Sequence, residues 1–83
     1  MKIEYTASVH TPAGWRGVKI AADAERISAG MARVTAVTAI DGETPAGRMS
    51  RTGARRQEYS GAGVAAREVG ARKRLSACSV LEA

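Results

Sequence analysis

The chain has almost none of the residues that usually reinforce a small protein. It contains one cysteine and one histidine among 83 residues. A lone Cys78 cannot close an intramolecular disulfide, and a lone His10 has no companion ligands for a metal site. We therefore expect neither a disulfide framework nor a bound metal, and no cofactor.

Large apolar side chains are also scarce. Phenylalanine is absent, aromatic residues make up 4% of the chain, and 17 of the hydrophobic positions are alanine. Residues 1–83 should form a single small domain, and a domain of this size buries only about 60% of the surface of its unfolded chain. Because alanine adds little apolar area, we expect a thin core and a marginally stable monomer. Self-association, most simply as a homodimer, is the remedy that remains.

Long apolar runs are missing too. Nothing approaches the roughly 18 consecutive apolar residues that a spanning helix needs. Polar and apolar residues alternate from Lys2 onward and include Glu4, unlike the start of a signal peptide. The many Ala, Gly and Arg residues are typical of a bacterial or phage gene. We expect a cytoplasmic protein in a bacterial host cell, with no membrane contact.

The first half of the chain has the two-residue period of β-strands. The alternation from Lys2 to His10 predicts a half-buried strand, and the turn residues 11–14 predict a reversal into a second strand. That strand continues to about Ala24, although a short helix over residues 21–29 is a competing interpretation. Residues 33–40 are rich in β-branched side chains and predict a third strand.

The second half begins with a turn and changes period. Asp41 and Gly42 are a strong reverse-turn signal. Between Thr52 and Val69 a helix is plausible, with Thr52 as N-cap and Gly70 as C-cap. Its predicted apolar stripe is Tyr59, Ala62, Ala66 and Val69, while Gly61 and Gly63 weaken its middle.

The chain end completes the predicted fold. A basic turn over residues 71–74 should lead into a last strand over residues 75–81. The whole chain then reads β-β-β-α-β. This order predicts an α+β protein in which a small antiparallel sheet of about four strands packs against one helix.

Two apparent catalytic motifs lack their structural context. Gly61, Gly63 and Ala66 match a dinucleotide-binding turn, but the polar residues before them cannot form the required buried parallel strand. Ser8 and His10 share a strand face that should be solvated, which disfavours a hydrolytic triad. We expect a binding protein and not an enzyme.

The excess positive charge lies entirely in the second half. Residues 1–47 contain five basic and five acidic residues, whereas residues 48–83 contain eight basic and three acidic ones. Guanidinium groups bind phosphates and carboxylates in bidentate fashion, so an arginine-rich surface suits an anionic partner. The candidate partner-binding residues are Arg48, Arg51, Arg55, Arg56, Arg67, Arg72, Lys73 and Arg74.

The composition of the basic half bears on the type of partner. Arg48, Arg51 and Arg55 have helical spacing if the helix begins early. Single-strand binders place stacking aromatics among their basic residues, and this half offers only Tyr59. An acidic protein or nucleoprotein surface is therefore favoured, a nucleic acid remains the alternative, and a merely solvated basic face is the simplest reading.

Two residues of the chain are candidates for dimer contacts. Trp15 lies at a turn, where capping the core is the favoured role and an exposed interface anchor is the alternative. Cys78 lies in an apolar run, where a buried inert thiol is the default. If the last strand is a sheet edge that pairs with its copy, two Cys78 thiols could instead approach each other.

The opening strand Met1-Lys2-Ile3-Glu4-Tyr5-Thr6, the size and the βββαβ plan with a charged face resemble small phage-encoded anti-CRISPR proteins that inhibit type I systems. The resemblance implies a stoichiometric inhibitor that blocks DNA engagement by a surveillance complex. Many such proteins are acidic DNA mimics, whereas this chain is basic. The resemblance therefore implies docking of the arginine surface on an acidic or nucleic-acid-bearing part of a CRISPR effector. The alternative is a small basic nucleic-acid-binding accessory or regulatory protein.

Overall fold

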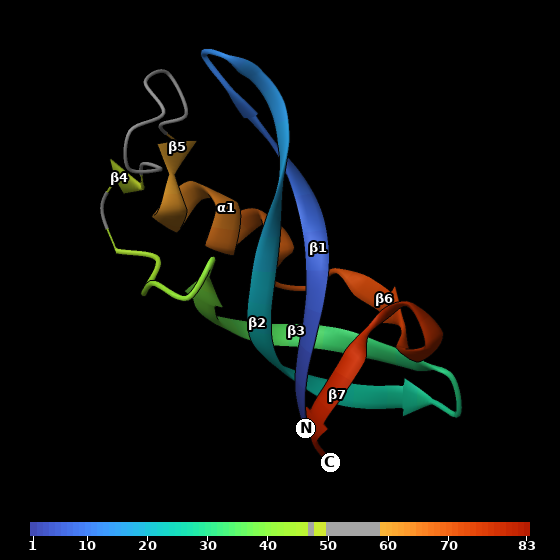
Figure 1. The fold of residues 1–83 in the computed structure, drawn as a ribbon. Coiled ribbons are helices and arrows are strands. Elements are labelled where there is room, and N and C mark those ends of the chain that lie inside the picture. Colours follow the sequence, from blue (N-terminus) through green and yellow to red (C-terminus); the bar gives the residue numbers. More distant parts are fainter. Residues whose placement is uncertain (47, 50–58) are drawn as a thin grey trace.

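A five-stranded antiparallel sheet with one short helix forms the protein. The computed structural model describes residues 1–46, 48–49 and 59–83. The sheet has the order β6-β3-β2-β1-β7, and β4 and β5 form a separate two-stranded ladder (Figure 1). The elements are β1 (Lys2–Thr11), β2 (Gly14–Ser28), β3 (Met31–Ile40), β4 (Arg48–Met49), β5 (Tyr59–Ser60), α1 (Gly61–Glu68), β6 (Arg72–Arg74), the 3-10 turn η1 (Leu75–Ala77) and β7 (Ser79–Glu82).

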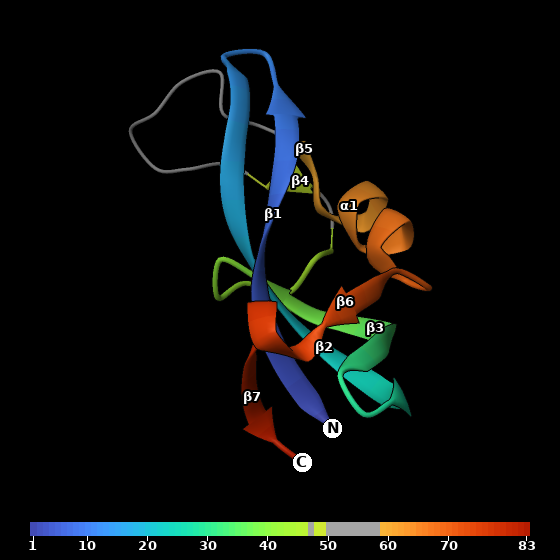
Figure 2. The ribbon, with the colours of Figure 1, turned by 90° about the vertical axis from the view of Figure 1, so that its right-hand side faces the viewer.

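The 15-residue strand β2 connects two hairpins. Its first part pairs with β1 from Gly14 to Asp23, and its second part pairs with β3 from Ile20 onward. The β1–β2 hairpin consequently projects beyond the other strands (Figures 1 and 2). The predicted first three strands are confirmed, and the competing helix over residues 21–29 is wrong. Alternation of apolar residues in β2 outweighs the helix propensity of its alanines.

The strand period places one face of the sheet in the core. Seven apolar side chains are less than 2% exposed, and none is larger than isoleucine. Tyr59 from β5 and Val64 from α1 complete the cluster. The core consists of Ile3, Tyr5, Val9, Val18, Ile20, Ala22, Ala24, Ala32, Val34, Ile40, Tyr59 and Val64.

Both predicted turns are present. The buried Thr11 hydroxyl accepts a hydrogen bond from the Ala13 amide at 3.1 Å and donates one to the Gly14 carbonyl at 2.8 Å. Asp41 and Gly42 have φ of 51° and 83°, which is the left-handed backbone of a tight two-residue hairpin turn. The Asp41 carboxylate also accepts a hydrogen bond from the Lys19 amide at 2.9 Å, tying this turn to β2.

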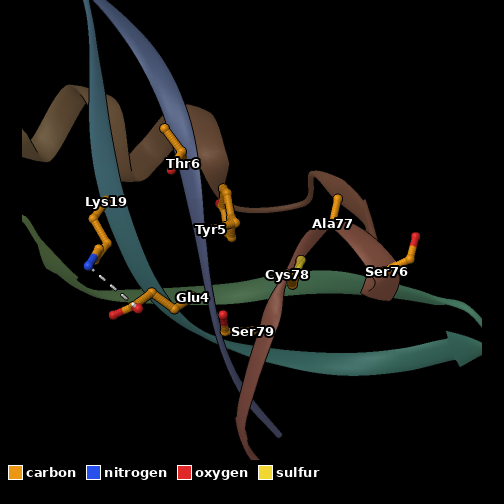
Figure 3. A pocket seen from close by; sticks show the side chains of 8 residues that line it. All are labelled: Glu4, Tyr5, Thr6, Lys19, Ser76, Ala77, Cys78 and Ser79. Atoms are coloured by element: carbon orange, nitrogen blue, oxygen red, sulfur yellow. Dashed lines mark ion pairs between the residues drawn. The ribbon is translucent and has the colours of Figure 1, made fainter.

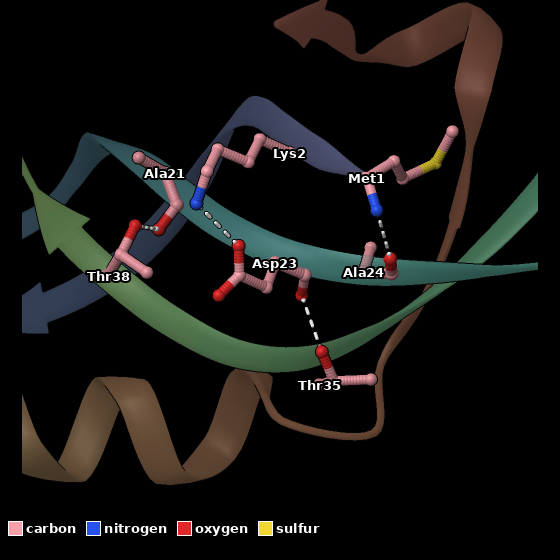
Figure 4. Close-up of polar contacts among 7 residues, drawn as sticks. All are labelled: Met1, Lys2, Ala21, Asp23, Ala24, Thr35 and Thr38. Atoms are coloured by element: carbon pink, nitrogen blue, oxygen red, sulfur yellow. Dashed lines mark hydrogen bonds and ion pairs between the residues drawn. The ribbon is translucent and has the colours of Figure 1, made fainter. Parts of the chain in front are cut away.

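Threonine hydroxyls support β2 where its register with β3 shifts. Shifts occur between Ala21 and Ala22 and between Asp23 and Ala24. Thr38 donates to the Ala21 carbonyl at 3.0 Å and Thr35 donates to the Asp23 carbonyl at 3.1 Å (Figure 4). Carbonyls beside the irregular positions thereby gain partners, and such irregularities increase the local twist of a strand.

Met1 and Lys2 are also held on β2. The Met1 carbonyl accepts from the Ala24 amide at 2.8 Å, and the Met1 amino group donates to the Ala24 carbonyl at 3.0 Å (Figure 4). Lys2 forms an ion pair with Asp23 at 3.0 Å. The hydrogen bond from the Lys2 ammonium to the Asp23 carboxylate raises the pKa of Lys2 above its ordinary value.

The helix is shorter than predicted. It begins after Ser60, whose hydroxyl caps it by accepting from the Gly63 amide at 3.0 Å, and Thr52 lies outside the described residues. Gly61 and Gly63 thus lie in its first turn and not in its middle. The C-cap is Val69, and Gly70 follows it with φ of 90°.

The predicted apolar stripe is also wrong. Val64 packs into the core cluster, so the side of α1 with Ala62, Ala66 and Val69 is exposed, and Tyr59 is buried from β5. The buried residues of α1 are Gly61 and Val64. Within the described ranges, no helix is both long and apolar enough to span a bilayer.

The end of the chain forms two edge strands where one strand was predicted. Residues 72–74 form β6 and not a turn, because they pair with Met31, Ala32 and Arg33 of β3. The predicted strand over residues 75–81 is divided into η1 and β7. Strand β7 pairs with β1 at the opposite edge of the sheet, which raises the strand number to five.

Candidate functional site

Strand β6 sorts its three basic residues between the two faces of the sheet. Lys73 lies opposite the buried Ala32, whereas Arg72 and Arg74 lie opposite Arg33 and Met31. Directly opposed residues of antiparallel strands share a face, so Lys73 faces the core side and both arginines face outward. Arg72 and Arg74 are exposed, and we call these two residues the basic edge.

A third arginine lies beside the basic edge on the same face. Arg33 is directly opposite Arg72 on one side and Glu25 on the other. Its guanidinium contacts the Glu25 carboxylate through Nε at 3.2 Å and through Nη2. This row across three strands therefore contains two cations, Arg33 and Arg72, and one anion, Glu25. Arg33, counted in the neutral half of the sequence, belongs to this surface.

No described carboxylate forms an ion pair with Arg67, Arg72 or Arg74. The ion pairs within the described ranges involve Lys2, Arg16, Lys19, Arg33 and Lys73. Arg67 is exposed in the last turn of α1, where a cation complements the helix dipole. The arginines of β6 have no such helical role.

Lys73 is held within the fold by two residues from other elements. Its Nζ lies 3.4 Å from Glu68 Oε1 and 4.5 Å from the centre of the Tyr5 ring. Tyr5 Oη donates to the same Glu68 oxygen at 2.6 Å. Strands β6 and β1 lie three positions apart in the sheet, so the sheet must curl around its core face for this contact to form.

The remaining predicted arginines divide into two groups. Arg48 lies in β4, so the helical spacing predicted for Arg48, Arg51 and Arg55 is wrong at its first member. Arg51, Arg55 and Arg56 lie outside the described residues. The structure thus brings Arg72 and Arg74 together on one strand and adds Arg33. The two-residue period of β6 is the signal that could have revealed this arrangement.

An open pocket of about 530 Å³ lies between β1 and the η1–β7 segment. Its lining consists of Glu4, Tyr5, Thr6, Lys19, Ser76, Ala77, Cys78 and Ser79 (Figure 3). Glu4 and Lys19 form an ion pair at 3.9 Å across its mouth. Burial raises the pKa of the Cys78 thiol, and the nearby Lys73 partly opposes that change. Cys78 Sγ hydrogen-bonds to the Arg74 carbonyl at 3.3 Å and not to a base, so the thiol stays protonated and weakly nucleophilic.

Trp15 does not cap the core. Its side chain is 69% exposed at the start of β2, and its ring packs edge-to-face on His10 with centroids 5.1 Å apart. The prediction of a core role is wrong because the projecting hairpin carries this residue past the buried face. Cys78 is half-buried and packs against the core cluster.

Metal-binding potential and similarity to known proteins add no further assignment. Within the described ranges, no group of three or more His, Cys, Asp and Glu side chains could hold a metal ion. Comparison with protein-family models, curated proteins and solved structures yields no match.

Proposed function

We propose that the protein acts by binding an anionic macromolecular surface through its basic edge. The observation that carries this proposal is the outward orientation of Arg72 and Arg74 on a sheet edge, beside Arg33. The Cα atoms of residues two apart on a strand lie about 7 Å apart, so the two guanidinium groups can reach successive carboxylates or phosphates.

An acidic protein or nucleoprotein surface fits this geometry better than exposed bases. Tyr5 and Tyr59 are both buried, and Trp15 lies on the projecting hairpin, on a different part of the sheet from β6 (Figure 1). Base recognition in single strands requires aromatic rings beside the cations. The basic edge has none among the described residues.

The function we propose is inhibition of a bacterial nucleoprotein complex by occupation of an acidic or nucleic-acid-bearing surface. The resemblance to anti-CRISPR proteins suggests a type I CRISPR surveillance complex as the target, and the mechanism is steric, without catalysis. Ion pairing between arginines and the target would set the association rate and make it sensitive to salt.

The test uses a purified type I surveillance complex and a labelled DNA duplex as separate probes. We expect the protein to bind the complex and to reduce its capture of target DNA, while binding to the duplex alone stays weak. Tight binding to the free duplex that weakens steeply with salt would instead identify the nucleic-acid-binding alternative, through counterion release.

A matched pair of variants separates the basic edge from net charge. Arg72→Gln with Arg74→Gln should weaken binding at least tenfold. Lys2→Gln with Lys19→Gln removes the same charge from exposed ion pairs elsewhere and should change binding less than threefold. Equal losses in the two variants would contradict a role for the basic edge.

A further inference from the structure

The two edges of the sheet differ sharply in charge. At one edge, β6 consists of Arg72, Lys73 and Arg74. At the other edge, β7 carries no charge from Ser79 to Leu81 and contains no proline. Natural sheets block edge-to-edge pairing with charged residues, prolines and bulges. Strand β6 is charged at every position, whereas the protection of β7 is limited to Glu82 and to the bulge at Leu81, where its register with β1 shifts.

Strand β7 also concentrates exposed apolar surface. In the described ranges, five large apolar residues are exposed, and the two that are adjacent in sequence are Val80 at 46% and Leu81 at 56%. Val80 lies opposite Ile3 of β1, and Leu81 is the extra residue of the bulge between Val80 and Glu82. Figures 1 and 2 show β7 at the rim of the molecule, beyond β1.

We infer that β7 pairs antiparallel with β7 of a second copy of this chain, so that two sheets join into one. This inference is independent of the proposed function. The positive charge on β6 disfavours pairing of two β6 strands, and the apolar β7 is complementary to itself. A two-fold contact between β7 strands closes on itself and leaves only the charged β6 strands as sheet edges.

Symmetry restricts the register of this pairing. A two-fold axis perpendicular to the sheet places each residue and its copy on the same face, so the axis passes beside Val80 or beside Leu81. With the axis at Val80, the two Glu82 residues lie on opposite sides of the axis and do not face each other. Glu82 also lies beside Lys2 of its own chain. No like charges therefore face each other across the interface.

The same register gives Cys78 a definite place. Cys78 is two positions from Val80, so the two Cys78 positions are about 13 Å apart along the strands. Disulfides require Cα atoms within about 7 Å. The dimer thus forms without a Cys78 disulfide, contrary to the thiol contact that a terminal edge strand suggests from sequence.

Sedimentation of the full chain tests the pairing. A four-residue ladder is small for a specific interface, so we expect a dissociation constant on the order of 10 µM and a species of twice 8.7 kDa at higher concentration. Leu81→Lys should raise the dissociation constant at least tenfold. Ser28→Lys adds the same charge to the exposed end of β2 and should leave it unchanged.

Cysteine crosslinking tests the register. In a Cys78→Ser background, Val80→Cys or Leu81→Cys should form an intermolecular disulfide under mild oxidation, and Ser28→Cys should not. The parent chain with Cys78 should stay uncrosslinked. A folded monomer at several hundred micromolar, or crosslinking by Cys78 and Ser28→Cys as readily as by residues 80 and 81, would overturn the inference.

Discussion

Tyr5 and Glu68 are 63 positions apart in the sequence, and the Tyr5 hydroxyl donates a 2.6 Å hydrogen bond to the Glu68 carboxylate. The Lys73 ammonium lies 3.4 Å from the same carboxylate oxygen and over the Tyr5 ring. These three side chains connect β1, α1 and β6. They hold the curled sheet together around a core in which, apart from Tyr5 and Tyr59, no side chain is larger than isoleucine.

Removing the Tyr5 hydroxyl should destabilise the fold measurably. Hydrogen bonds to charged groups contribute about 1.5–3 kcal/mol, so we expect Tyr5→Phe to lower the free energy of unfolding by about 2 kcal/mol in urea titrations. Glu68→Gln alone should also destabilise. In the double variant the two losses should not add, since both remove the same interaction. Additive losses would show that the two groups act separately.

The fold should lose stability in alkali. Burial raises the pKa of Tyr5 above its ordinary value near 10, and the Glu68 carboxylate raises it further. Burial also raises the pKa of Tyr59, and the nearby Asp41 adds to this effect. A raised pKa in the folded state stabilises fully below the unfolded value, so the loss begins as the pH rises through about 10.

Tyrosinate absorbance measures this directly. In the native protein neither tyrosine should ionise near pH 10, whereas the urea-unfolded chain should titrate there. Ionisation of the native protein should coincide with loss of β-sheet circular dichroism. Native tyrosines that titrate at the same pH as the unfolded chain, with the fold intact, would contradict the burial of both hydroxyls.

A single methylene should distinguish core from surface isoleucines. Ile20 is fully buried where β2 pairs with both β1 and β3, whereas Ile27 is 37% exposed. We predict that Ile20→Val lowers the free energy of unfolding by about 1 kcal/mol, because the small core cannot fill the space. Ile27→Val should change it by less than about 0.5 kcal/mol. Equal effects in urea unfolding would place the core elsewhere.

The Asp41–Gly42 turn should depend on glycine. Gly42 has φ of 83°, a conformation that costs an alanine about 1–2 kcal/mol, so Gly42→Ala should lower the melting temperature. Gly30→Ala is the matched control. Gly30 also lies in a hairpin turn, its φ is outside the left-handed region, and an added methyl meets nothing within 4 Å. That change should be neutral or slightly stabilising. A neutral Gly42→Ala would contradict the turn geometry.

Local signals account for the parts of the fold that could be predicted. Alternation at residues 2–10 and 33–40 identified strands because the side-chain period is a property of the backbone itself. Asp41-Gly42 identified a tight turn because both positions need positive φ. The helix boundary was wrong because Ser60 and Thr52 are both acceptable N-caps, and only the pairing of Tyr59 and Ser60 with β4 keeps these two residues out of the helix.

The amino-acid sequence by itself determined the three long strands, their turns and the excess of positive charge near the chain end. Only the tertiary structure decided that Arg72 and Arg74 face outward while Lys73 faces inward. Residues 71–74 have no strong strand signal of their own, and pairing with β3 imposes the extended conformation that separates them. The same holds for β7, whose apolar residues became an exposed edge because η1 directs the chain from β3 toward β1. Edge positions depend on which strands are neighbours, and that is a property of the folded sheet.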